Sequence, residues 1–199
     1  MKADYQNKLA RIISTIFIPP TLTVLSFIYL ALEFEKDLNK KYFTIFISVL
    51  FGFILHIGMF VYFFHKGIIS DVDAKQKYQR TIPYYFSIII FLIGFILLLI
   101  GGVHLVSIAF WFCYISNTFL VILINRYVKI SIHAMGVSGP LALFVFLIGI
   151  NALLFLPILF AVGWSRIKLG VHSLIEVTTG AILGFVAVYL QLYLFLNKF

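Results

Sequence analysis

Seven apolar stretches separated by short polar segments occupy most of this 199-residue chain. A helix of about 20 apolar residues spans the hydrocarbon core of a bilayer. Charged residues make up only 11% of the chain, against about 25% in soluble domains. The sequence therefore predicts an all-α polytopic transmembrane bundle of about six to seven helices, forming one integral membrane domain over residues 1–199. The stretches are Ile12–Leu32, Tyr42–His65, Ile82–Ile100, Val103–Asn125, Ala134–Ile150, Ala152–Trp164 and Ser173–Leu196.

Two glycine-containing breaks decide how these helices alternate across the membrane. Gly101-Gly102 and the segment Ile148–Asn151 each interrupt a longer apolar run and predict a hairpin turn. With both hairpins in place, the loops after the second, fourth and sixth helices lie on the same side of the membrane. These loops carry the three polar clusters of the chain.

Other small residues and prolines indicate packing rather than chemistry. The pair Pro19-Pro20 predicts a kink in the first helix, and Gly180 with Gly184 has the spacing that lets two helices approach closely. Cys113 is the only cysteine, which excludes an internal disulfide bond.

The net charge of +8 comes from basic residues at helix ends, where they meet lipid head groups. Membrane lipids are therefore the expected partners, and nucleic acid is not. Basic residues are more numerous on the side of the polar clusters, which by the positive-inside bias predicts a cytoplasmic site.

The C-terminal cluster combines Arg166, His172 and Glu176. His172 and Glu176 are one helical turn apart, and a carboxylate that holds hydrogen on one ring nitrogen leaves the other nitrogen free to attack. Ser173 and Glu176 also form a capping-box pattern, and the two interpretations are equally supported. Arg166 offers a planar fork suited to phosphate; its alternative role is an anchor at the membrane surface.

The middle cluster places Lys129, Ser131 and His133 before a helix start, where backbone N–H groups bind anions. A second histidine on the side of His172 suits general-acid work on a leaving oxygen. A packed interfacial histidine is the alternative. Three further histidines have no partners in the sequence and are interpreted as packed or interfacial: His56, His65 and His104.

The third cluster runs from Asp71 to Arg80. Lys77 and Arg80 are three residues apart and can share a helical face towards an anion. Asp71 and Asp73 either bind Mg²⁺ or balance the neighbouring lysines.

Together the clusters resemble the type 2 phosphatidic acid phosphatase superfamily, also called lipid phosphate phosphatases. That family's third motif, Ser-Arg-x5-His-x3-Asp, is similar to Ser165-Arg166-x5-His172-x3-Glu176, with glutamate in place of aspartate. Its second motif, Pro-Ser-Gly-His, resembles the segment Ile130–His133, which keeps the serine and histidine but lacks the proline and glycine.

The family's first motif, Lys-x6-Arg-Pro, fits in two incomplete ways. Starting from Lys75 keeps the lysine and Pro83 but places Ile82 where the arginine belongs. Anchoring on Arg80 instead puts Asp73 at the lysine position. The chain thus resembles a divergent member of the superfamily, with the likeness running from about Asp71 to Gly184 within a domain core of residues 71–197.

The resemblance implies a phosphatase that needs no metal or other cofactor. In it His172 attacks phosphorus, Glu176 orients His172, and His133 protonates the leaving group. The residues implied to hold the phosphate are Arg166, Lys75, Arg80, Lys77, Ser131, Lys129 and Ser165.

We therefore expect a lipid phosphatase of the plasma membrane that acts through a phosphohistidine on phosphatidate, phosphatidylglycerol phosphate or a polyprenyl diphosphate. The family usually works on the outer face, opposite to the side that the charge distribution predicts. Two alternatives stay open: a lipid-linked phosphotransferase with the same histidine chemistry, and a non-catalytic membrane protein or transporter.

Overall fold

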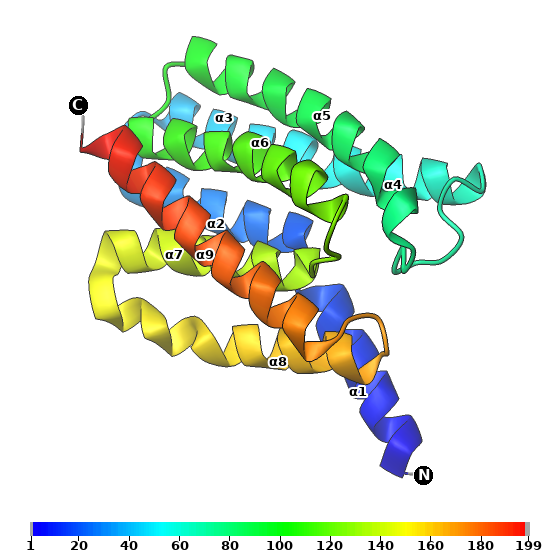
Figure 1. Cartoon of the computed structure of the whole chain (residues 1–199). Coiled ribbons are helices and arrows are strands. Elements are labelled where there is room, and N and C mark those ends of the chain that lie inside the picture. The colour runs from blue at the N-terminus through cyan, green and yellow to red at the C-terminus, as the bar shows by residue number, and fades with distance from the viewer. Residues whose placement is uncertain (1, 198–199) are drawn as a thin grey trace.

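The computed structural model describes residues 2–197, in which all regular elements are helical (Figure 1). Five helical segments are long and apolar enough to cross a membrane, and the bent pair α1–α2 makes a sixth. The predicted all-α bundle is confirmed, and the chain is an integral membrane protein. The α-helices are α1 (Lys2–Ile16), α2 (Pro19–Phe34), α3 (Leu38–Ile47), α4 (Leu55–His65), α5 (Thr81–Ile100), α6 (Leu105–Asn125), α7 (Ile132–Ile148), α8 (Leu156–Lys168) and α9 (Leu174–Leu196).

The first apolar stretch is divided between α1 and α2, which meet at an angle of 47°. Pro19 and Pro20 form the first turn of α2. A proline ring has no N–H and clashes with the preceding turn, so it starts a helix well but cannot continue one. The predicted kink is confirmed, and it brings the end of α1 against α8 (Figure 1).

The second apolar stretch is one continuous helical segment from α3 to α4, with a π-helical part, η1 (Ser48–Ile54), between them. A π-helix is rare and occurs most often near functional sites. Asp37 caps the start of α3 by accepting hydrogen bonds from the backbone N–H groups of Asn39 and Lys40.

Both predicted hairpins are confirmed. Gly102 between α5 and α6 and Gly149 after α7 have positive φ angles of 57° and 65°, which glycine adopts without steric cost. After Gly149 the chain forms a 3-10 helix, η3 (Gly149–Phe155), and returns along α7 as α8 (Figure 1). A short 3-10 helix, η2 (Lys77–Arg80), leads into α5.

The main core is aromatic and joins α2, α5 and α6. Trp111 is fully buried and donates a hydrogen bond of 2.8 Å from its indole N–H to the carbonyl oxygen of Phe91. Phe27 packs edge-on against Trp111, with ring centroids 5.0 Å apart. Such contacts hold the helices whose ends carry the polar loops.

The loops α4–α5, α6–α7 and α8–α9 all lie at the same end of the bundle, together with the α1–α2 junction (Figure 1). Gly180 and Gly184 let α9 cross closely over the start of α7. A Cβ atom on Gly180 would lie 2.5 Å from the carbonyl oxygen of Ser131, and one on Gly184 would lie 2.8 Å from that of Met135. The predicted packing role of these glycines follows directly from the contacts.

Replacing Gly180 by alanine should destabilise the protein, because the new methyl group forces α9 away from the Ser131 backbone. Overpacking of this kind costs about 1–3 kcal/mol. Gly58 on α4 is the matched control, since a Cβ there meets nothing within 4 Å. Gly58→Ala should be neutral or slightly stabilising. Thermal unfolding in detergent checks both, and equal melting temperatures for the two variants would contradict the close approach of α7 and α9.

Candidate functional site

His172 and Glu176 form a short hydrogen bond at the start of α9. The Nδ1–Oε2 distance is 2.6 Å, and the His172 side chain is almost fully buried. An ionised carboxylate only accepts hydrogen bonds, so Nδ1–H is the donor. Ser173 also caps α9 by accepting a hydrogen bond from the Glu176 backbone N–H. Both interpretations of the sequence therefore apply: the serine caps the helix and the carboxylate holds the imidazole.

The environment keeps the His172 ring neutral. Burial, followed by the positive charges of Arg80, Lys129 and Arg166, lowers the pKa of His172 to about 3. The proton stays on Nδ1, and Nε2 makes no hydrogen bond among the described residues. A neutral imidazole with a free Nε2 lone pair is the form that a nucleophile or base requires.

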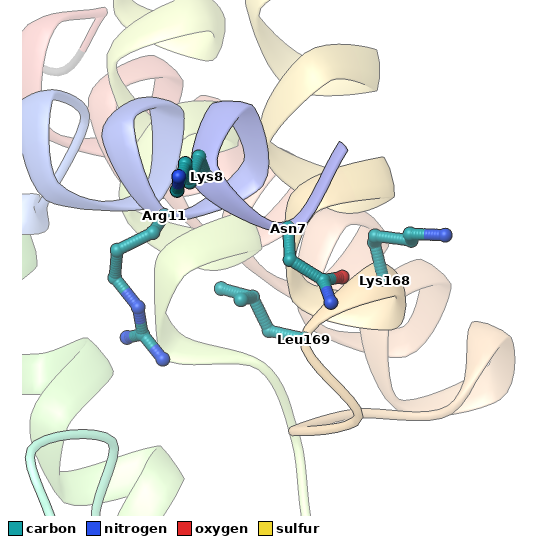
Figure 2. Close-up of a pocket in the computed structure, with 5 residues that line it drawn as sticks. All are labelled: Asn7, Lys8, Arg11, Lys168 and Leu169. Carbon is teal, nitrogen blue, oxygen red and sulfur yellow. The ribbon is translucent and has the colours of Figure 1, made fainter. Parts of the chain in front are cut away.

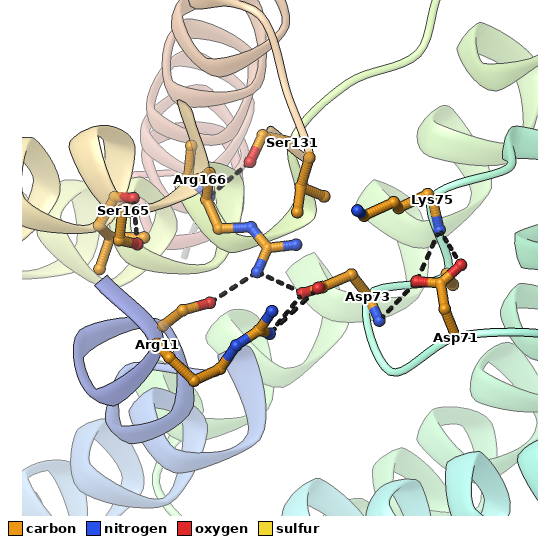
Figure 3. Close-up of polar contacts among 12 residues, drawn as sticks. Arg11, Asp71, Asp73, Lys75, Ser131, Ser165 and Arg166 are labelled. Atoms are coloured by element: carbon orange, nitrogen blue, oxygen red, sulfur yellow. Dashed lines mark hydrogen bonds and ion pairs between the residues drawn. The ribbon is translucent and has the colours of Figure 1, made fainter. Parts of the chain in front are cut away.

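Arg166 and Asp73 form a buried ion pair at the centre of a polar network that extends to exposed Arg11 (Figure 3). The Nη1 of Arg166 donates to Oδ1 of Asp73 at 2.8 Å and to the hydroxyl oxygen of Ser14 at 2.6 Å. Arg11 donates to both carboxylate oxygens of Asp73, at 3.1 and 3.0 Å. The Nε of Arg166 is buried and has no partner within the described part of the chain. The network joins α1, α8 and the α4–α5 loop.

The hydrogen bonds of the two aspartates are to groups other than lysine side chains. Burial by itself would raise the pKa of Asp73, but the guanidiniums of Arg166 and Arg11 outweigh burial and hold this pKa below its ordinary value. Asp71 accepts hydrogen bonds from the backbone N–H groups of Asp73 and Lys75 and so closes a turn of the loop. Asp73 thus pairs with arginines, whereas Asp71 has a local backbone role.

Arg80 is buried and fixes the loop to the start of α7. Its Nε donates to the carbonyl oxygen of Ala74 at 2.6 Å, and its Nη1 donates to that of Ile130 at 3.4 Å. Lys77 donates from Nζ to the carbonyl oxygen of Arg126 and is exposed. Lys75 is also exposed. Of the three basic residues in this cluster, only Arg80 lines the cavity described below.

The side chains of three other predicted phosphate ligands form hydrogen bonds with backbone groups instead. Ser131 caps α7 by accepting a hydrogen bond from the N–H of Ala134, and Ser165 donates to the carbonyl oxygen of Val162. Lys129 donates from Nζ to the carbonyl oxygen of Val171, 2.6 Å away, and its Nζ lies 3.6 Å from Glu176 Oε2. These side chains position the two histidine-bearing segments but do not line the cavity.

One cavity of about 630 Å³ has candidate site residues at one end. Three guanidiniums and one carboxylate leave this end with two net positive charges. Beyond it the wall is mainly apolar and comes from α2, η1, α4, α5, α6, α7 and α9. The cavity therefore has the polarity of an amphiphile with an anionic head. Its polar end is formed by Arg11, Asp73, Arg80, His133, Arg166 and His172.

A second depression, of about 360 Å³, lies between α1 and the C-terminal end of α8 (Figure 2). Arg11 borders both this depression and the cavity, and Lys8 and Lys168 add two more positive charges. Basic groups at the mouth of a site raise the local concentration of anions.

Sequence reasoning missed Arg11 and Ser14, because Arg11 borders the first apolar stretch, Ser14 lies within it, and neither belongs to one of the three polar clusters. Their three-residue spacing, which places both on one helix face, was the available signal. Comparisons with known proteins find no matching family profile, curated protein or solved structure. The function is therefore argued from the geometry of the cavity.

We predict that His172 stays neutral well below the ordinary histidine pKa of about 6.5. Because the folded pKa is lowered, the unfolded chain binds a proton first as the pH falls. The contribution of His172 to stability is therefore present above about pH 6.5 and is lost towards pH 3. Nitrogen NMR of labelled histidines, assigned with His172→Gln, should show Nδ1–H and unprotonated Nε2 down to about pH 5. A His172 signal that titrates near 6.5 would contradict the described environment.

Proposed function

We propose that the protein is a lipid phosphatase of the plasma membrane, resembling the type 2 phosphatidic acid phosphatases. One observation carries the proposal: buried His172, held by Glu176, and the Arg166 guanidinium lie at the cationic end of a cavity whose remainder is mainly apolar. A phosphate head group fits the first part, and an acyl or prenyl tail fits the second. Phosphatidate, phosphatidylglycerol phosphate and polyprenyl diphosphates have this form.

In the first step, the Nε2 lone pair of His172 attacks phosphorus and the bond from phosphorus to the lipid oxygen breaks. The ring, still protonated on Nδ1, becomes positively charged, and Glu176 stabilises that charge through the 2.6 Å hydrogen bond. His133 donates a proton to the leaving oxygen. A bound phosphate dianion offsets the two net positive charges of the cavity end that His133 lines.

In the second step, His133 takes a proton from water and the water oxygen attacks phosphorus. The nitrogen–phosphorus bond breaks, inorganic phosphate leaves, and His172 returns to its neutral form. A hydroxyl acceptor in place of water would give the phosphotransferase alternative.

The ion-pair network prepares Arg166 for the phosphate. Asp73 and Ser14 hold only Nη1 of Arg166, and the buried Nε lacks a partner in the described structure. A phosphate oxygen supplies that partner. A guanidinium already fixed in place loses little freedom when it binds the anion.

The test is phosphate release from the three lipid phosphates in mixed micelles with a chelator present. The protein should be active, and Arg166→Lys should lower the rate about 100-fold, the effect of removing one fixed donor to a transition state. An ammonium keeps the charge but not the planar fork. Arg126→Lys is the matched control, because Arg126 is exposed at the end of α6.

Three outcomes would count against this function. No release from any lipid phosphate would reject it, and equal rates for Arg166→Lys and Arg126→Lys would reduce Arg166 to a structural residue. Phosphate transfer that requires an added lipid or sugar alcohol would establish the phosphotransferase instead.

A further inference from the structure

His56 is a polar group deep in the helical bundle that the proposed chemistry does not use. It follows the π-helical segment η1, and its Nδ1 lies 2.7 Å from the carbonyl oxygen of Phe51. Its Nε2 is buried and has no hydrogen-bond partner in the described part of the chain. His56 lines the same cavity as His172. A buried ring nitrogen without a hydrogen bond is unfavourable in an apolar wall unless a ligand supplies the missing partner.

Two hydroxyl groups share this part of the wall. His56 and Tyr114 both pack against the ring of Phe91, with centroid distances of 4.4 and 5.3 Å from it. Thr23 of α2 packs closely against Gly52 of η1, which is one helical turn before His56. A Cβ atom on Gly52 would lie only 2.8 Å from the Thr23 side chain. Both Tyr114 and Thr23 line the cavity. The π-helix, α2 and α6 thus bring a small polar patch into an otherwise apolar region.

The positions of its residues along α4 and α6 place the patch about half a bilayer core from the helix ends. His56 precedes the end of α4 by nine residues, which is about 13 Å at the rise of an α-helix. Tyr114 precedes the end of α6 by eleven residues, or about 16 Å. Half of a typical hydrocarbon core is about 15 Å. A polar residue at that depth is a functional-site hypothesis by default.

The hydrogen bond to Phe51 defines what the patch can bind. A carbonyl oxygen only accepts, so Nδ1 of a neutral His56 carries the hydrogen and Nε2 is left as an acceptor. The complement of Nε2 is therefore a hydroxyl or an amide N–H. A plain hydrocarbon tail has neither group.

We propose that the deep end of the cavity is a second subsite, which binds a hydrogen-bond donor on the hydrophobic part of the ligand. The substrate class is then a lipid phosphate whose chain carries a hydroxyl or amide N–H. The identity of the head group rests on the proposed function, whereas the subsite rests on His56 and its surroundings.

Two probes test the subsite: hexadecyl phosphate with a hydroxyl group at mid-chain, and the same compound with a methyl group there. Their dissociation constants and their rates of phosphate release are measured with the full-length protein in nanodiscs. We expect wild type to bind the hydroxylated probe about tenfold more tightly than the methylated one, the upper range for one neutral hydrogen bond. His56→Phe should bring this ratio close to one.

Two variants serve as controls. His65→Phe makes the same substitution at the exposed end of α4, and the ratio should equal that of wild type. His56→Gln keeps an acceptor oxygen and should retain part of the preference, and it replaces His56→Phe if the latter does not fold. A wild-type ratio near one, or an equal ratio in wild type and His56→Phe, would overturn the subsite.

The two measurements separate the two proposals. Hydrolysis of both probes with no preference for the hydroxyl group would reject the subsite and leave the phosphatase standing. A His56-dependent preference in binding without phosphate release would keep the subsite and reject the phosphatase.

Discussion

The buried ion pair between Arg166 and Asp73 is the interaction on which the site depends. A guanidinium at the cytoplasmic or outer end of a membrane helix is costly to bury alone, and the carboxylate 2.8 Å away compensates for it. Arg11 binds the other side of the same carboxylate. The Asp73 carboxylate therefore holds together three segments that are far apart in sequence: α1, the α4–α5 loop and α8.

The pair also sets the charge and shape of the cavity. Without Asp73 the polar end would carry three adjacent positive charges, and the loop from α4 to α5 would lose its attachment to α8. With it, two net positive charges face His172 and His133, close to the charge of one phosphate dianion. In the proposed function, the apolar remainder of the cavity determines which molecules can bring a phosphate to the histidines, and the proposed subsite at His56 adds a polar requirement on the hydrophobic part of the ligand.

Local patterns in the sequence predicted the parts of the structure that local forces determine. The apolar stretches, the kink at Pro19 and the turns at Gly102 and Gly149 follow from backbone chemistry within a few residues, and so does the one-turn spacing of His172 and Glu176. Contacts between residues far apart in the chain leave no local pattern in the sequence, so they could not be predicted from it.

The residues predicted to bind phosphate show which contacts the sequence could not predict. Lys75 and Lys77 have the charge for an anion site, but the loop directs them to the exposed surface, and Arg80 alone of that cluster reaches the cavity. Asp73 was predicted to balance lysines or bind Mg²⁺, and only the packing of the α4–α5 loop against α1 and α8 brings it to arginines. Ser131 caps α7 because the first N–H groups of a helix need hydrogen-bond partners. Ser165 instead donates to a carbonyl oxygen one turn back in α8.

The covalent step is the most direct test of the account, because a histidine nucleophile carries the phosphoryl group during turnover and a histidine base does not. Wild-type protein is quenched in alkali during turnover of a lipid substrate labelled in its phosphate. We predict an acid-labile, alkali-stable label on the peptide that contains His172, absent in His172→Ala, which should also be inactive. Rapid turnover without such a label, together with substantial activity in His172→Ala, would contradict the mechanism.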